Sequence, residues 1–263
     1  MKRDGHIHTP FCPHGSKDSL NSYVEAAILQ GFHEITFTEH APLPEGFIDT
    51  TPTKDSAMKL SVMEEYLSVL QQIQKEYKQD LTIHLGLEVD YIEGFEKETT
   101  KFLNEYAPYL DDSILSVHFL KNNQNWYCLD YNPDVFEEMI TLFGSVSAIY
   151  ESYFHTVHQS ILANLGTYKP KRIGHMTLVH KFQKKFPCPK DFSTEIDAIL
   201  QTVKLHHYEL DYNGAGVVKP LCCETYPPAE VAVKAKKMGI PLVYGSDAHS
   251  AKGIGQGSEQ IHA

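Results

Sequence analysis

Short β-rich stretches alternate along the chain with longer stretches in which apolar residues recur every three or four positions. The first pattern is typical of strands, and the second is typical of helices that bury one face. We expect strands at residues 4–8, 34–40, 81–88, 112–118, 171–175, 208–213 and 242–246. We expect amphipathic helices within residues 20–30, 57–77, 136–165, 194–206 and 228–238.

This alternation predicts an α/β fold, because strands separated by helices form βαβ units with a parallel sheet. Seven strands in 263 residues fit a distorted (β/α)7 TIM-like barrel better than a short open sheet. A doubly wound sheet would show the same alternation and remains the alternative. Since no linker, repeat or low-complexity tract interrupts the pattern, we predict one domain over residues 1–263.

Polar residues close every expected strand. In chain order they are His6-x-His8, Thr38-Glu39-His40, Gly86-x-Glu88, Ser116-Val117-His118, Gly174-His175, Tyr212-Asn213 and Gly245-Ser246-Asp247-Ala248-His249. In a parallel barrel all carboxyl ends lie on one face, where barrel active sites are built. Residues two apart on a strand also share a face, as in the two histidines of His6-x-His8. We therefore expect groups from both ends of the chain to meet in one pocket.

These strand ends suggest a metal site, and the chain is rich in histidine, with 15 residues. The candidate ligands are His6, His8, His14, His40, Glu88, His118, His175, Asp247 and His249. One zinc-like ion takes three or four protein ligands, so nine would serve two or three ions if one carboxylate bridges. Imidazole and carboxylate without thiolate suit zinc, iron or manganese. The alternative of core histidines would bury many imidazoles and carboxylates together at a high cost.

Two residues of the loop after the first strand are less certain as ligands. His14 lies within residues 9–16 and not at a strand end, so spacing alone leaves it open. Cys12 is a conceivable soft ligand, although a small buried residue explains it better.

Composition narrows the possible partners. The net charge of −11 argues against non-specific binding to nucleic acid or to an anionic membrane. No apolar run reaches the length of a membrane span, and the N-terminus has no apolar stretch behind its basic residues, as a signal peptide would. Five cysteines without C-x-x-C spacing indicate a reducing, cytoplasmic setting.

The strand-end motifs together resemble those of the polymerase-and-histidinol-phosphatase (PHP) superfamily, in order and over nearly the whole chain. Within this superfamily, the sequence between the motifs is similar to that of the monofunctional histidinol-phosphate phosphatases. The stretches that carry this likeness are residues 4–13, 37–42, 86–91, 174–182, 213–216 and 224–227. The combination is specific, whereas each motif alone would be weak.

The resemblance implies a distorted seven-stranded barrel that holds a trinuclear centre. By that pattern the first metal is held by His6, His8, Glu88 and Asp247, the second by Glu88, His118 and His175, and the third by His14, His40 and His249. The family often has arginine within Gly-Leu-Arg-Lys-Pro, where this chain has Val218. A basic contact to the substrate phosphate is therefore either missing or supplied by Lys219.

The activity that the resemblance implies is hydrolysis of L-histidinol phosphate, a small-molecule phosphomonoester, in histidine biosynthesis. A hydroxide that bridges two ions would attack the phosphoryl group. We assign catalytic roles to Glu88, Asp247 and His249. The leaving group would receive its proton from a metal-bound water, from Asp247 or from His249. Arg172, three residues before His175, is a second candidate phosphate contact, beside a surface role.

Two other functions remain as alternatives. One is a broader phosphoesterase or 3′–5′ nuclease of the same fold, against which the negative charge argues. The other is a regulatory domain that keeps its metals without turnover, against which the complete ligand set argues. The oligomeric state and the native metal do not follow from the sequence.

Overall fold

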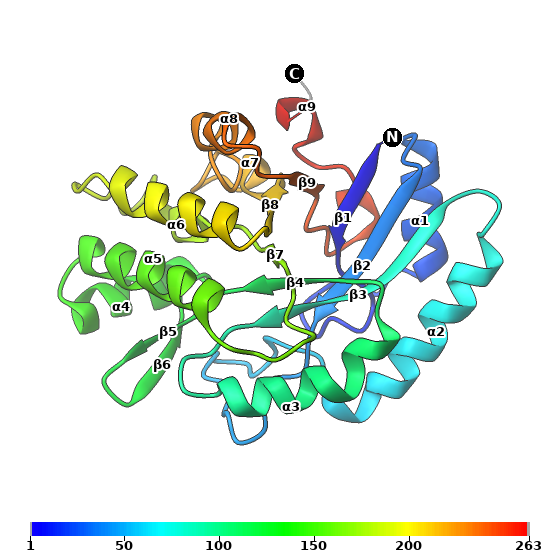
Figure 1. The fold of residues 1–263 in the computed structure, drawn as a ribbon, viewed down its shortest axis with the longest axis horizontal. Coiled ribbons are helices and arrows are strands. Elements are labelled where there is room, and N and C mark those ends of the chain that lie inside the picture. The colour runs from blue at the N-terminus through cyan, green and yellow to red at the C-terminus, as the bar shows by residue number, and fades with distance from the viewer. Residues whose placement is uncertain (1, 262–263) are drawn as a thin grey trace.

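Seven parallel strands form one sheet in the computed structural model, which describes residues 2–261 (Figure 1). Residue 1 and residues 262–263 of the predicted domain lie outside the described part. The strands are β1 (Arg3–Ile7), β2 (Glu34–His40), β3 (Thr82–Asp90), β4 (Asp112–Ser116), β7 (Arg172–Ile173), β8 (Glu209–Asn213) and β9 (Leu242–Gly245). They lie side by side in chain order, and every neighbouring pair is parallel. All seven predicted strands are present.

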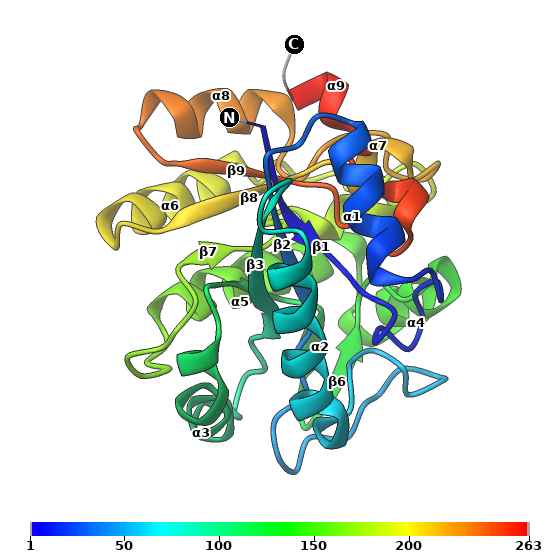
Figure 2. The same ribbon diagram turned by 90° about the vertical axis from the view of Figure 1, so that its right-hand side faces the viewer.

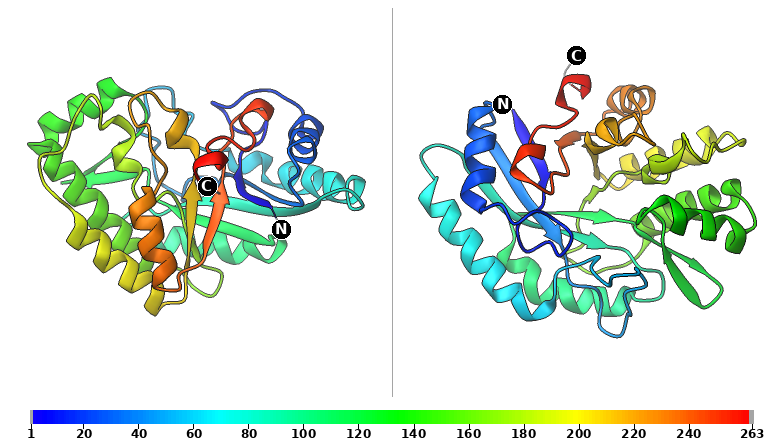
Figure 3. Two further views of the ribbon diagram at one scale, coloured as in Figure 1. Left: turned by 90° about the horizontal axis from the view of Figure 1, so that it is seen from above. Right: turned by 180° about the vertical axis from the view of Figure 1, so that it is seen from behind.

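The sheet closes between its first and last strands. The backbone N–H of His8 donates to the carbonyl of Ala248 at 3.0 Å, and that of Asp247 donates to the carbonyl of His6 at 2.7 Å. Near this closure β8 and β9 run side by side in the same direction (Figure 3). The fold is therefore the predicted distorted (β/α)7 barrel and not an open doubly wound sheet. The distortion is greatest at β7, which has only two residues in the ladder.

Helices connect the strands and cover the outside of the sheet, with α2 crossing in front of β2 and β3 (Figure 2). They are α1 (Leu20–Leu29), α2 (Met63–Glu76), α3 (Glu96–Tyr106), α4 (Pro133–Phe143), α5 (Val146–Leu162), α6 (Ser193–Leu205), α7 (Ala215–Val218), α8 (Ala229–Lys237) and α9 (Ser258–Ile261). Single 3-10 turns are η1 (Leu60–Val62), η2 (Ala107–Tyr109), η3 (Leu178–Phe182) and η4 (Ala251–Gly253). Within residues 2–261, none of these helices combines the length and the apolar character that a membrane span requires.

The prediction of one helix over residues 136–165 is wrong, because the segment forms α4 and α5. Gly144 ends α4 with a positive φ of 93°, a conformation that glycine adopts without steric cost. Ser145 then caps α5 by accepting a hydrogen bond from the backbone N–H of Ala148 at 3.1 Å. The break depends on Gly144 and Ser145, two residues to which the sequence prediction gave no weight.

A hairpin between β4 and α4 was not predicted. Its strands are β5 (Phe119–Asn122) and β6 (Asn125–Cys128), and side chains from both pack into a small cluster away from the main core. This satellite cluster consists of Leu43, Phe47, Ile92, Phe95, Phe119, Trp126, Cys128 and Tyr131. Phe47 lies at its centre, with its ring edge-on to Phe119 at 5.2 Å and to Trp126 at 5.8 Å. The cluster thereby anchors the irregular segment 41–59, which follows β2, against the hairpin.

Candidate metal centre

The carboxyl ends of the seven strands surround a cavity of about 490 Å³. Seven of the nine predicted ligands line it, namely His14, His40, Glu88, His118, His175, Asp247 and His249. His6 and His8 lie beneath it and are fully buried. The structure therefore brings all nine residues together, including His14, which comes from the loop after β1 and not from a strand end.

Glu88 lies at the centre of this group and is 1% exposed. Its Oε1 atom is 2.8 Å from Nε2 of His175 and 3.7 Å from Nε2 of His118. Its Oε2 atom is 3.1 Å from Nδ1 of His40 and 3.5 Å from Nε2 of both His6 and His8. The two oxygens thus face two different sets of histidines, as a bridging carboxylate requires.

Asp247 joins the pair formed by His6 and His8. Its Oδ1 atom is 3.1 Å from Nε2 of His8 and 3.8 Å from Nε2 of His6. The residue follows β9 with a φ of 53°, which is uncommon for a residue other than glycine. Backbone strain of this kind is concentrated at functional sites, and here it accompanies a carboxylate directed at the histidines.

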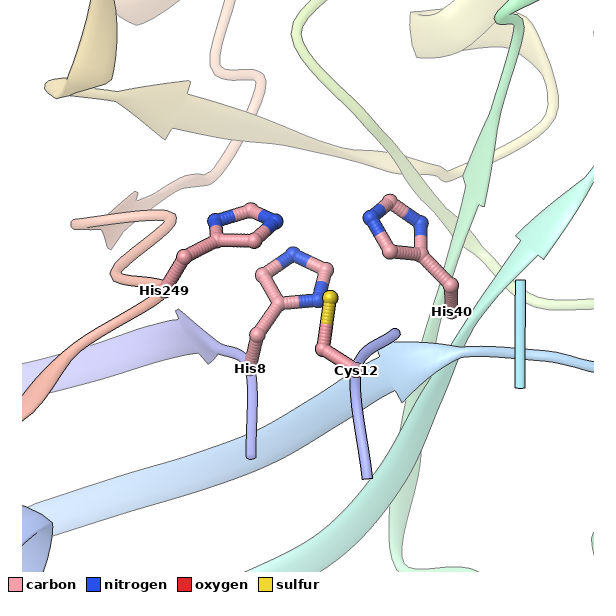
Figure 4. A group of neighbouring side chains, drawn as sticks. All are labelled: His8, Cys12, His40 and His249. Atoms are coloured by element: carbon pink, nitrogen blue, oxygen red, sulfur yellow. The ribbon is translucent and has the colours of Figure 1, made fainter. Parts of the chain in front are cut away.

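A third group is formed by His14, His40 and His249. The Nε2 atoms of His14 and His249 are 3.2 Å apart, and the ring centres of His14 and His40 are 5.1 Å apart. Figure 4 shows His40 and His249 converging from opposite sides above His8 and Cys12. Burial raises the pKa of the Cys12 thiol, and Glu39 nearby adds to this effect. Cys12 is fully buried beside these histidines and packs against them.

Three carboxylates hold the outer nitrogens of ligand histidines, and sequence reasoning missed this function. Asp211 accepts from Nδ1 of His6 at 2.8 Å, and Asp90 accepts from Nδ1 of His118 at 2.7 Å. Glu39 lies 3.3 Å from Nδ1 of His8. Such contacts orient a metal-binding imidazole and raise its basicity. The sequence signal was a second carboxylate beside a strand-end ligand, as in Thr38-Glu39-His40.

The donor atoms fit divalent cations. The Nε2 atom of His6 and the Nδ1 atom of His175 are buried without a hydrogen-bond partner, which is costly unless a ligand binds them. The Nδ1 atoms of His14 and His249 lie 2.7 Å and 3.1 Å from the backbone carbonyls of Asp55 and Asp247, so a neutral ring at either position carries its proton on Nδ1. The two Nε2 lone pairs then face each other at 3.2 Å, where a cation would relieve their repulsion. Imidazole nitrogens and carboxylate oxygens are the donors that zinc, iron and manganese accept.

The pKa values show that the pocket favours positive charge. Burial opposes protonation of His8 and His118, but carboxylates outweigh it and raise their pKa values to about 9 and about 10. Burial also opposes ionisation of Glu88, yet the surrounding histidines hold its pKa well below the ordinary value. By contrast, burial and the neighbouring His8 hold the pKa of His249 well below its usual range. That imidazole is therefore neutral and ready to coordinate an ion.

This architecture matches a known family. A model of the PHP domain matches residues 4–215 of the chain. The chain belongs to the PHP domain family. It is also 50% identical over 261 residues to the histidinol-phosphatase of Bacillus subtilis (strain 168), and this alignment covers 98% of the chain and 97% of that protein.

Two solved structures share this PHP fold. The provisionally named histidinol phosphatase HisK from Listeria monocytogenes superimposes with a TM-score of 0.94, at 41% identity, covering 98% of this chain and 99% of that one. The histidinol phosphate phosphatase HisK from Lactococcus lactis, complexed with zinc, L-histidinol and phosphate, has a TM-score of 0.74 at 23% identity. It covers 99% of this chain and 90% of that one. At that identity the second likeness shows the fold alone.

The remaining wall of the PHP-domain pocket carries two lysines. Lys219, predicted as a phosphate contact, lines the cavity, and so does Lys181, which sequence reasoning did not single out. Burial lowers the pKa of Lys219, and the positive charge of Lys181 nearby lowers it further. Val218, at the position of the family's arginine, is 57% exposed and does not line the cavity.

The structure does not bring Arg172 to the site, and this corrects the expected phosphate contact. Arg172 begins the short strand β7, and its buried guanidinium forms an ion pair with Asp112, at the amino end of β4. Arg3, at the start of β1, pairs with the same carboxylate at 2.6 Å. Arg172 therefore lies toward the amino ends of the strands, away from the ligands. Sequence distance from His175 could not reveal to which end the side chain would turn.

Proposed function

We propose that this protein hydrolyses L-histidinol phosphate to L-histidinol and inorganic phosphate, using two or three divalent ions. The observation that carries the proposal is the placement of Glu88, whose two oxygens face two separate sets of histidines. The 50% identical relative from Bacillus subtilis is a histidinol-phosphatase, and the Lactococcus lactis structure holds L-histidinol and phosphate. Both support the same reaction here.

The three groups of ligands would hold the ions as the family pattern implies. Zinc is supported by the Lactococcus lactis complex, while iron and manganese suit the same donors. When bound, the ions would lower the pKa of water and offset the charge of the phosphoryl group. The fully buried carboxylates of Asp211 and Glu39 would keep His6 and His8 in the orientation that coordination needs.

The chain's own side chains would complete the reaction. Lys181 and Lys219 line the cavity and are placed to bind phosphate oxygens. A water held at the centre would give the leaving alcohol its proton, and Asp247 and His249, which both line the same cavity, are placed to position that water. We also propose a cytoplasmic location, since all five cysteines are free thiols.

The substrate panel is the direct test of this function. We expect kcat/KM for L-histidinol phosphate to exceed that for glycerol phosphate, a nucleoside monophosphate and a short oligonucleotide by at least about tenfold. The reason is that a site built to hydrogen-bond a substrate's polar groups discriminates strongly against analogues that lack them. Faster turnover of the oligonucleotide or the nucleotide would favour the nuclease alternative and refute the proposal.

Metal content is the second test. We expect protein purified without chelator, or reconstituted with zinc, iron or manganese, to contain two or three ions per chain, because nine ligands exceed what one ion uses. Elemental analysis against protein concentration measures this ratio. A ratio of one or less after reconstitution with each of the three metals would contradict a multinuclear centre.

A further inference from the structure

The cavity has a second side that no metal ligand occupies. Asp130, Tyr131 and Phe119 line it from the hairpin and the residues just after it, and Lys181 lines it from η3. The satellite cluster supports this wall, since Phe119 and Tyr131 belong to it. The organic part of a substrate held by its phosphate at the ligands would therefore extend along these residues.

Asp130 and Lys181 form an ion pair in this wall. The Nζ atom of Lys181 is 2.8 Å from Oδ2 of Asp130, and both side chains are only 18% exposed. The other oxygen, Oδ1, accepts a weak hydrogen bond from the thiol of Cys128 at 3.4 Å. A carboxylate can accept about four hydrogen bonds, so Asp130 keeps the capacity to bind another donor.

Asp130 is ionised and close to the ligands. Burial opposes its ionisation, but Lys181 outweighs that effect, and His118 and His175 add to it, so the pKa of Asp130 lies well below its usual value. Burial opposes protonation of Lys181, but Asp130 outweighs that effect and raises the pKa of Lys181. The pair therefore places one negative and one positive group next to each other in the wall of the cavity.

The other carboxylates of the cavity are less suited to bind a cation. Asp90 already accepts the proton of His118 Nδ1 at 2.7 Å. Asp55 accepts from the hydroxyl of Thr53, and its backbone carbonyl accepts from the exposed His14, which places it at the outer edge. Among the described carboxylates that line the cavity and are not predicted ligands, Asp130 is the one that pairs with a lysine of the same cavity and holds no ligand histidine.

We propose that Asp130 binds the ammonium group of the substrate, so that the Asp130–Lys181 pair selects phosphate esters of 2-amino alcohols. Such an ester carries a negative phosphate and a positive ammonium two carbon atoms along the chain. The charge pair presents the opposite signs side by side, with Lys181 toward the phosphate and Asp130 toward the ammonium. Tyr131, the next residue, lines the same wall and offers a ring for the substrate's aromatic group. This inference rests on the proposed function.

The test compares substrates with and without the amine. We expect Asp130→Asn to lower kcat/KM for L-histidinol phosphate by at least about tenfold, because a hydrogen bond to a charged group is lost. For an analogue of L-histidinol phosphate that lacks the amino group, kcat/KM of Asp130→Asn should be less than about threefold below that of the wild type. Phosphoethanolamine and ethyl phosphate form a second matched pair. Circular dichroism and metal content establish that the variant is folded and loaded.

Asp55→Asn is the matched control. Like Asp130, Asp55 lines the cavity, and its side chain does not contact a predicted ligand histidine. It should affect both substrates of each pair alike. If Asp130→Asn lowers kcat/KM equally for substrates with and without the amino group, Asp130 only positions Lys181, and the inference is overturned. If the wild type hydrolyses the amine-free analogue as well as L-histidinol phosphate, the inference also fails. Failure of the wild type to hydrolyse L-histidinol phosphate at all would instead refute the proposed function.

Discussion

Glu88→Gln is expected to lower kcat about a thousandfold, which corresponds to about 4 kcal/mol of transition-state stabilisation. The substitution keeps the shape of the side chain but removes the charge, and an amide offers one oxygen where the carboxylate offers two. One oxygen faces His6, His8 and His40, and the other faces His118 and His175. Steady-state kinetics at saturating metal and substrate measure the effect.

His14→Ala is the comparison for this prediction. His14 is exposed and contributes one nitrogen at the outer group, so its removal leaves the Glu88 contacts intact. We expect the kcat of His14→Ala to fall less than that of Glu88→Gln. Turnover of Glu88→Gln close to that of the wild type, at matched metal content, would refute the bridging role.

Asp211→Asn is expected to raise the dissociation constant for metal about 10- to 100-fold. Asp211 is fully buried, and its Oδ2 atom accepts from Nδ1 of His6 at 2.8 Å and from the amide of Asn213 at 3.0 Å. The amide of Asn213 also contacts Asp247 at 3.2 Å, so one carboxylate supports two ligands. Competition with a chromophoric chelator gives the dissociation constant directly.

Asp134→Asn is the control for this experiment, because the Asp134 side chain on α4 is 89% exposed and does not line the cavity. It should bind metal as the wild type does. An Asp211→Asn protein with unchanged metal affinity would show that the contact to His6 is structural only.

Much of the site could be predicted because a parallel barrel places the carboxyl ends of all its strands close together, however far apart they are in the sequence. Once a strand ends in a histidine or a carboxylate, parallel packing brings that residue to the common rim. This reasoning placed His40 and Glu88 correctly from their strands alone. His14 required the resemblance to a known family, since the loop that carries it has no periodicity from which a position follows.

The features that could not be predicted depend on long-range packing. Arg172 was assigned by its distance in sequence from His175, but its ion pair with Asp112 determines where its guanidinium lies. Asp130 follows a hairpin and Lys181 lies in a 3-10 turn, and no strand-end rule describes either position. Charge pairs of this kind exist only after distant segments meet, so neither residue is distinctive in the sequence.

The closure of the barrel between β1 and the residues after β9 has a consequence for protein synthesis. His6 and His8 are translated 241 residues before Asp247 and His249. At ribosomal speeds the delay between them is roughly ten to fifty seconds. Until Asp247 and His249 have been added, a nascent chain lacks part of each of the two ligand groups to which they belong, so the complete centre can only be loaded after that point. The ion that fills it then depends on which metals the cell holds available at that moment, so growth in media supplemented with different metals should yield differently loaded enzyme.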